Sequence, residues 1–161
     1  MTTEQYNECV EQHADGVYRF ILHNLRDSEL ARDVVQDSFE KMWMNVGNIT
    51  ASKSKSYLFT TAYHTMLDRI RRGKKQGSWD EVQEHDYSHT TEIAGLNEVL
   101  REALNRLPEI QRSVIILRDY EGYNYEEIGE ITNLNESQVK VYIYRARVAL
   151  KNYIGKIENV I

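Results

Sequence analysis

The apolar residues of this chain recur every three or four positions over most of its length, which is the spacing of one face of an α-helix. A first stripe consists of Val10, Ala14, Val17, Tyr18, Ile21, Leu22 and Leu25. A second helix is expected after a capping Asp27 or Ser28, and a third over residues 56–72, with the polar loop 47–55 between them. The 161 residues contain one proline, so the pattern predicts an all-α fold.

The composition changes after the third expected helix. Residues 73–92 contain glycines and acidic side chains without a sustained apolar period, so we expect a flexible linker, placed at residues 76–92. The sequence therefore predicts two small helical domains, at residues 1–75 and 93–161. In the second domain, Pro108 suits the first turn of a helix.

Residues 125–147 have the pattern of a short helix, a sharp turn and a longer helix. Gly129 permits close approach of the two helices, and Asn133 is a residue type that tolerates a left-handed turn. The buried face of the longer helix is expected to hold Val139, Ile143, Ala146, Leu150 and Ile154. The opposite face would present Ser137, Gln138, Lys140, Val141, Tyr144, Arg145 and Lys151. Such a unit is typical of a DNA-binding helix-turn-helix, and the alternative is a helical hairpin with a solvated basic face.

The net charge of −5 argues weakly against nucleic acid, but the charges are distributed unevenly. Residues 1–40 carry nine acidic and three basic side chains, whereas residues 53–75 carry one acidic and seven basic ones. Residues 76–92 carry five acidic side chains and no Lys or Arg, and residues 136–156 carry five basic and one acidic. The pattern predicts two separate contacts with phosphate and acidic faces for another partner.

Other kinds of chemistry find little support. The single cysteine, Cys9, cannot form an intrachain disulfide, and no apolar run approaches the roughly 20 residues of a membrane span. His85 and His89 are spaced four apart but lie in the acidic linker, which does not favour a metal site. We find no nucleophile motif and no glycine-rich phosphate loop. The sequence predicts a cytoplasmic protein without catalytic residues, metal, cofactor or direct membrane insertion.

Three segments of the chain can be compared with known families: "DSELARDVVQDSFEKMW", "KSYLFTTAYHTMLDRIRR" and "RLPEIQRSVIILRDYEGYNYEEIGEITNLNESQVKVYIYRARVALK". They resemble, in this order, region 2.2, regions 2.3 and 2.4, and region 4 of the sigma-70 family of RNA polymerase sigma factors, in its compact extracytoplasmic-function (ECF) group. Because the three motifs occur in the family's order, the resemblance is more specific than one helix-turn-helix. It implies promoter-specific transcription initiation, with region 2 at residues 1–75 and region 4 at residues 93–161.

The resemblance also implies roles for particular residues. Region 2.2 in the family docks on the clamp of core RNA polymerase, and here the corresponding residues are Asp33, Gln36, Asp37, Phe39, Glu40 and Trp43. The alternative from the residues alone is that the two aromatic rings are core and the acids merely solvated. The longer helix of the helix-turn-helix would read the minus-35 element of promoter DNA.

Regions 2.3 and 2.4 in the family engage the melted minus-10 element, where a positive surface interleaved with aromatic rings suits unstacked bases. The corresponding residues are Lys53, Lys55, Tyr57, Tyr63, His64, Arg69, Arg71 and Arg72. Phe59 is a further candidate for stacking, but the helical stripe favours a place in the core. Tyr63 and His64 stand where many members have Arg-Asn, so we expect an altered base preference.

The resemblance implies one more partner, an anti-sigma factor that holds the protein inactive and that commonly spans the membrane. Gln138 stands where the family usually has Thr, and it could read adenine, touch phosphate or only cap the helix. Two other functional classes remain open. The chain could be a stand-alone DNA-binding regulator with a helical partner-binding domain, or a helical interaction protein with no role on DNA.

Overall fold

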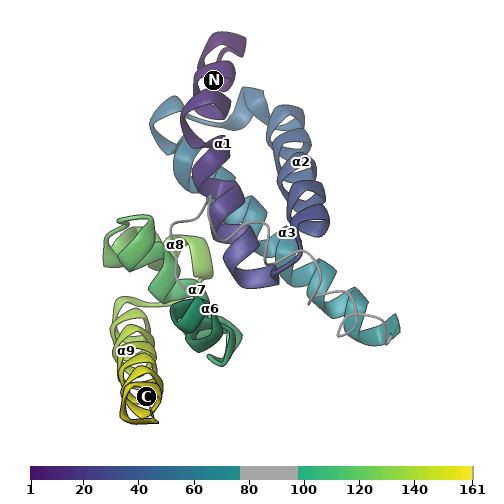
Figure 1. Cartoon of the computed structure of the whole chain (residues 1–161). Coiled ribbons are helices and arrows are strands. Elements are labelled where there is room, and N and C mark those ends of the chain that lie inside the picture. Colours follow the sequence, from purple (N-terminus) through teal and green to yellow (C-terminus); the bar gives the residue numbers. More distant parts are fainter. Residues whose placement is uncertain (77–97, 161) are drawn as a thin grey trace. The chain divides into compact units, whose positions relative to one another are not determined.

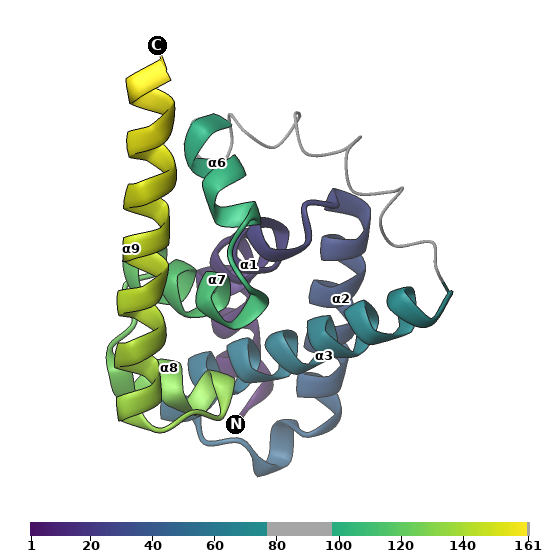
Figure 2. The same ribbon diagram turned by 90° about the horizontal axis from the view of Figure 1, so that it is seen from below.

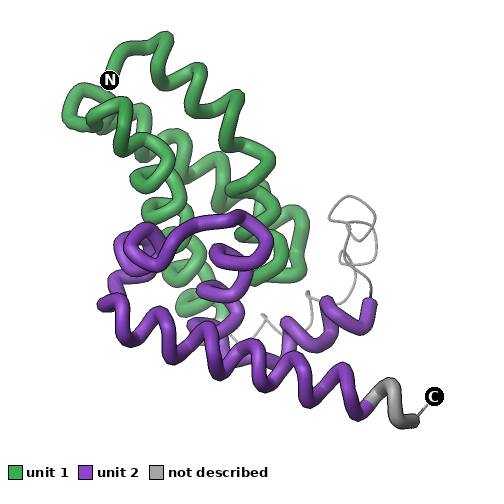
Figure 3. Tube along the Cα trace, turned by 90° about the vertical axis from the view of Figure 1, so that its left-hand side faces the viewer, with its two compact units in different colours: residues 1–87 green, residues 88–161 purple. Residues whose placement is uncertain are grey.

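The computed structural model describes residues 1–76 and 98–160, and in these residues all regular secondary structure is helical, with no strand (Figure 1). The chain divides into two compact units, residues 1–87 and 88–161, which Figure 3 colours separately. The predicted all-α fold is confirmed. The predicted linker at residues 76–92 and the histidine pair at residues 85 and 89 lie almost wholly outside the described residues.

Unit 1 is built from three helices, α1 (Thr3–Leu25), α2 (Ser28–Met44) and α3 (Ser54–Gln76), each of which contacts the other two (Figures 1 and 2). Thr2 and Gln5 form a capping box at the start of α1. The side chain of Asp27 accepts a hydrogen bond from the Leu30 N–H, so Asp27 rather than Ser28 caps α2. Arg26 ends α1 in the left-handed conformation, with φ 58°, which turns the chain directly into α2.

The core of unit 1 consists of the apolar stripes of its three helices. Phe20 is fully buried, and its ring centroid lies 5.8 Å from that of Phe59 and 6.3 Å from that of Tyr63. Phe59 is 2% exposed, which confirms its place in the core. The loop between α2 and α3 contains two short 3₁₀ turns, η1 (Val46–Asn48) and η2 (Ala51–Lys53), and the buried Ile49 fixes it to the core.

Unit 2 is arranged along its last helix, α9 (Glu136–Val160), which α6 (Glu98–Asn105), α7 (Glu109–Ile115) and α8 (Tyr125–Thr132) all contact (Figure 2). Pro108 is the capping residue of α7, one position before the first helical turn in which the sequence placed it. A π-helical turn, η3 (Ile116–Tyr120), continues α7 and ends where the Glu121 N–H donates to the Ile116 carbonyl at 3.0 Å.

The turn between α8 and α9 has the local chemistry that the sequence predicted. Asn133 is left-handed, with φ 60°, and the Leu134 N–H donates to the Gly129 carbonyl at 3.0 Å. A Cβ atom at Gly129 would lie 2.6 Å from the Leu134 carbonyl oxygen, so only glycine fits this approach without a shift of backbone. The turn therefore fixes the angle at which α9 leaves α8.

Candidate nucleic-acid and partner-binding surfaces

The two faces of α9 differ sharply in exposure. Val139, Ile143 and Ala146 are buried against the rest of unit 2, while Leu150 and Ile154 are half-buried. The predicted DNA-facing residues are all exposed, with Tyr144 at 69% and Val141 at 44%. The other members of this exposed set are Ser137, Gln138, Lys140, Arg145 and Lys151. Positive and apolar groups thus project together from one helix face, as a major-groove reader requires.

Three residues of this face have fixed local partners. The Asn135 N–H donates to Gln138 Oε1 at 3.0 Å, and the Gln138 N–H donates to Asn135 Oδ1 at 2.8 Å, which is a capping box. The sequence left three roles open for Gln138: reading adenine, contacting phosphate or capping the helix. The structure shows the capping role. Lys140 Nζ lies 3.6 Å from Glu136 and 5.6 Å from the Tyr125 ring centroid, while Arg145 Cζ lies 6.0 Å from the Tyr142 centroid. These contacts orient the two cations without covering them.

Arg147, on the same helix, is held by an ion pair that no sequence pattern indicated. Its Nη2 donates to Asp119 Oδ1 at 2.7 Å and its Nε to Asp119 Oδ2 at 3.4 Å. This hydrogen bonding to Asp119 raises the pKa of Arg147. Arg118, the residue before Asp119, lies over the Tyr125 ring, with its Cζ atom 4.6 Å from the ring centroid, and donates a hydrogen bond to the Tyr123 carbonyl. The π-helical turn η3 thus directs its charged residues at α8 and α9.

One face of α2 borders an open groove of about 710 Å³, and the charged residues that line it are Arg32 and Glu40. Trp43 is 46% exposed and Met44 82%, so the interpretation of Trp43 as a core residue is wrong; Phe39 is half-buried. The groove is lined by Tyr6, Tyr18, Arg32, Val35, Gln36, Phe39, Glu40, Trp43 and Met44. The structure therefore brings four predicted docking residues together and adds residues of α1, which the sequence treated only as core or not at all.

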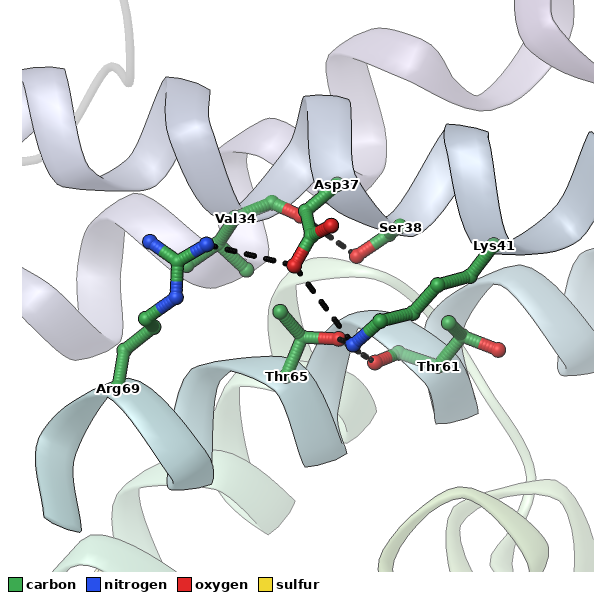
Figure 4. A network of polar contacts seen from close by, with 7 residues as sticks. All are labelled: Val34, Asp37, Ser38, Lys41, Thr61, Thr65 and Arg69. Atoms are coloured by element: carbon green, nitrogen blue, oxygen red, sulfur yellow. Dashed lines mark hydrogen bonds and ion pairs between the residues drawn. The ribbon is translucent and has the colours of Figure 1, made fainter. Parts of the chain in front are cut away.

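Asp33 and Asp37 do not line this groove. Asp33 is exposed on α2, whereas Asp37 is half-buried between α2 and α3 (Figure 4). Arg69 Nη2 lies 3.3 Å from Asp37 Oδ2, and Lys41 Nζ lies 3.6 Å from the same oxygen and donates to Thr65 Oγ1 at 2.9 Å. Asp37 and Arg69, which the sequence assigned to two different partners, therefore bind each other.

The remaining predicted minus-10 residues lie at the two ends and along the outer face of α3. Lys53, His64, Arg71 and Arg72 are exposed, while Lys55 and Tyr57 are half-buried. Arg71 Nη1 lies 3.7 Å from Asp68, an exposed pair that leaves the guanidinium accessible. The ring of His64 packs edge-on against Tyr63, with 5.5 Å between centroids. The basic side chains thus lie towards the two ends of α3, with His64 exposed between them.

The prediction that Tyr63 stacks on a DNA base needs correction. Its side chain is 3% exposed and packs against Phe20, with 27° between the ring planes. A ring in this position has no free face for a base, because the core of unit 1 occupies it. Tyr63 contributes to the core and supports the exposed His64.

No group of three or more histidine, cysteine or acidic residues within the described parts of the chain could hold a metal ion. In the same residues, no helix is both long and apolar enough to cross a bilayer. The free Cys9 is buried, and burial raises the pKa of its thiol while a hydrogen bond with Ser54 opposes that shift.

Comparisons with known proteins agree with this arrangement. The family model "Sigma-70 region 2" matches residues 9–76, and "Sigma-70, region 4" matches residues 97–150. The chain is 30% identical over 153 residues to the ECF RNA polymerase sigma factor SigM of Bacillus subtilis, covering 90% of this chain and 92% of SigM. It is 32% identical over 149 residues to the RNA polymerase sigma factor SigV of the same species, with 92% and 90% covered.

Solved structures share the fold. The sigma factor RpoE of Bartonella quintana, in complex with the anti-sigma factor NepR, matches with a TM-score of 0.78 at 23% identity, covering 95% of this chain and 98% of RpoE. CnrH, in complex with the cytosolic domain of CnrY, matches with a TM-score of 0.72 at 20% identity, covering 94% and 88%. Together with the family models and the two Bacillus relatives, these likenesses establish that the chain belongs to the ECF group of the sigma-70 family, the sigma factors that direct promoter-specific transcription initiation.

Proposed function

We propose that the two units of this sigma factor divide promoter recognition between them. Residues 1–75 bind core RNA polymerase and the minus-10 element, residues 93–161 bind the minus-35 element, and residues 76–92 link the two. The observation that carries the proposal is the exposed α9 face, which combines Lys140 and Arg145 with an exposed aromatic ring in a helix-turn-helix. Nucleotidyl transfer belongs to the polymerase, so the chain itself acts as a binding and melting factor rather than an enzyme.

At the minus-35 element, α9 enters the major groove. Lys140, Arg145 and Lys151 neutralise phosphates or meet base edges, which makes binding salt-dependent. Val141 and Tyr144 add apolar contact, for which the methyl group of thymine is the available partner in the major groove. Ser137 lies in the first turn of α9, where backbone N–H groups favour a phosphate. Gln138 contributes by capping the helix.

At the minus-10 element, the basic face of α3 and the loop before it hold the melted strand. Lys53, Lys55, Arg71 and Arg72 contact phosphates, and the half-buried Tyr57 offers the accessible part of its ring to a base. His64 meets a base edge through its ring nitrogens, which gives a base preference different from that of members with Arg-Asn at this place. Arg69 supports this face through its pair with Asp37.

Core polymerase docks on α2. Trp43 and Phe39 supply apolar area in the groove that Glu40 also lines, and Asp33 is exposed elsewhere on the same helix, a combination suited to a partner helix with both apolar and basic side chains. Asp37 contributes to this face mainly by fixing α2 on α3.

The protein works in the cytoplasm, where its polymerase is, and an anti-sigma factor holds it inactive. Support for this partner comes from the RpoE structure, which contains the anti-sigma factor NepR, and from the structure of CnrH in complex with the cytosolic domain of CnrY. The partner of this chain is expected to be membrane-spanning, with a cytosolic segment that covers its binding surfaces.

Run-off transcription on genomic promoter fragments with the cognate core RNA polymerase tests both interfaces together. Transcripts should require added protein and should be lost with Glu40→Arg, which reverses the charge of the docking face, and with Arg145→Ala, which removes a DNA contact. Glu40 is preferred to Asp37 for this purpose because Asp37 also holds α2 against α3.

Two matched controls should leave the transcripts intact. Glu8→Arg reverses an exposed charge on α1, and Lys156→Ala removes an exposed cation near the end of α9. If no transcript appears, yet the protein alone binds a duplex specifically through Arg145, a stand-alone regulator replaces this proposal.

A further inference from the structure

Tyr6, in the second turn of α1, makes two contacts with the exposed aromatic end of α2. Its ring centroid lies 5.0 Å from that of Trp43, with 59° between the ring planes. Its hydroxyl donates a hydrogen bond to the Phe39 carbonyl at 3.1 Å. One residue of α1 thus contacts both of the aromatic residues that the groove presents from α2.

The position of Trp43 explains why such a contact matters. Trp43 lies one residue before the end of α2, is 46% exposed, and is followed by the 82% exposed Met44. A large side chain at a helix end retains rotamer freedom, and ordering a side chain on binding costs affinity. The Tyr6 ring occupies one side of the indole, so Trp43 is already ordered as a wall of the groove before any partner arrives.

The hydrogen bond requires a protonated phenol. Burial, and then the neighbouring Cys9 and Glu40, raise the pKa of Tyr6. The hydroxyl therefore remains a donor throughout the neutral range. Its acceptor, the Phe39 carbonyl, belongs to the helix backbone, which fixes the direction from which the Tyr6 ring meets Trp43.

We propose that Tyr6 is a positioning residue for polymerase binding, which holds Trp43 so that the groove between α1 and α2 receives an apolar side chain from a helix of core RNA polymerase. The inference rests on the proposed docking face of α2 and extends it to α1. Glu40 and Arg32 both line the same groove, so an occupant with a basic and an acidic group on either side of its apolar side chain fits it. The docking surface is then formed by two helices rather than by α2 alone.

The test compares Tyr6→Leu, which removes the ring and hydroxyl but keeps apolar bulk, with Tyr6→Phe, which keeps the ring. Both are made in the full-length protein with Trp79→Phe, so that Trp43 is the only tryptophan. Affinity for purified core RNA polymerase, iodide quenching of Trp43 fluorescence and the unfolding midpoint are measured. Tyr153→Leu, the same change at a half-buried tyrosine of α9, is the matched control.

Tyr6→Leu should weaken polymerase binding about tenfold and increase the quenching of Trp43, because an aromatic contact and a hydrogen bond are both lost. Tyr6→Phe should weaken polymerase binding about threefold, because only the hydrogen bond is lost, and should leave the quenching near that of wild type. Tyr153→Leu should change neither quantity. A purely structural role for Tyr6 would lower the unfolding midpoint without a graded effect on affinity and quenching in the folded protein, and that result overturns the proposal.

Glu40→Arg separates this inference from the docking face on which it rests. If Glu40→Arg weakens polymerase binding and Tyr6→Leu does not, Tyr6 has no positioning role and the docking face stands. If neither variant changes the affinity, the docking face itself is wrong. Should Tyr6→Leu fail to fold, Tyr6→Phe decides, and an affinity equal to that of wild type then overturns the proposal.

Discussion

The two units use their charged residues differently. In unit 1, a carboxylate proposed at first for the polymerase and an arginine proposed for DNA are paired, since Asp37 and Arg69 join α2 to α3 at 3.3 Å (Figure 4). In unit 2, the residues proposed for DNA project from a helix whose opposite face is buried, and Tyr144 at 69% exposure is the clearest case. An ion pair that joins that helix to the rest of unit 2, Arg147 with Asp119, involves a residue outside the proposed DNA-contacting set.

This difference decides how substitutions should be interpreted. On α9, a DNA-facing side chain can be removed without loss of packing, so a change in promoter binding reports on the interface. On α2 and α3, removing Asp37 takes the shared carboxylate from Arg69 and Lys41, and removing Arg69 takes one of the two cations from Asp37, so binding and stability change together. A loss of binding therefore has two different origins: a lost contact with the partner in unit 2, and a partly destabilised fold in unit 1.

The largest effect of a substitution on stability is expected at the turn between α8 and α9 in unit 2. Gly129→Val places atoms where even a Cβ would lie 2.6 Å from a backbone oxygen, so α8 and α9 must move apart. Such overpacking should cost about 2–3 kcal/mol of unfolding free energy, measured by chemical denaturation. Gly155→Val on α9, where no heavy atom lies within 4 Å of the added Cβ, is the control and should be neutral. Equal effects at both glycines would contradict the role of the close approach.

Tyr144→Ala should separate binding from stability in unit 2. We expect holoenzyme binding to promoter DNA to weaken about tenfold, because an exposed aromatic contact is lost. The unfolding free energy should stay within about 0.5 kcal/mol of wild type, because the side chain makes little contact in the free protein. Asn152→Ala, at another exposed position of α9, should affect neither. A loss of stability equal to the loss of binding would make Tyr144 structural.

Asp37→Asn should show the opposite behaviour in unit 1. It removes the charge that faces Arg69 and Lys41, whose pairs with Asp37 measure 3.3 and 3.6 Å, and should cost about 1 kcal/mol of stability. Asp33→Asn, at an exposed position of the same helix, should cost less than about 0.5 kcal/mol. Denaturation of both variants in low and high salt measures the difference, which salt should reduce. If the two variants are equally stable, the α2–α3 pair contributes nothing.

The smallest effect concerns pH and His13 of α1. Burial, and then the charge of Lys55, lower the pKa of His13 below its usual 6.5. The unfolded chain therefore binds a proton more readily than the folded one, so stability present above pH 6.5 is lost as the pH falls through the lowered pKa. The unfolding midpoint should fall slightly between about pH 7.5 and about pH 5.5, and His13→Gln should reduce that fall. An identical pH response in the variant would exclude His13 as its source.

Sequence patterns led to accurate expectations wherever neighbours along the chain decide the structure. The left-handed Asn133 and the need for glycine at position 129 follow from the chemistry of a single turn. The buried face of α9 follows from the spacing of Val139, Ile143 and Ala146, because one helix face meets the same surroundings over several turns.

The same patterns led to less accurate expectations for aromatic rings in unit 1. The family resemblance predicts that Tyr63 contacts DNA, but the ring is core; the apolar stripe predicts that Trp43 is core, but its side chain is 46% exposed. The spacing of apolar residues along each helix places both rings near the boundary between its buried face and its exposed face. The side on which each lies depends on the neighbouring helix, here Phe20 of α1 against Tyr63 and the ring of Tyr6 against Trp43.

By itself, the sequence determined the helical class, the helix-turn-helix with its outward basic face, and the sigma-70 resemblance, because all three depend on local spacing and residue type. Only the tertiary structure decided that Asp37 pairs with Arg69, that Arg147 pairs with Asp119, and that the ring of Tyr6 contacts that of Trp43 beside a groove. Each of these contacts joins residues that lie far apart along the chain, and helix packing rather than helical period sets which side chains meet across such separations.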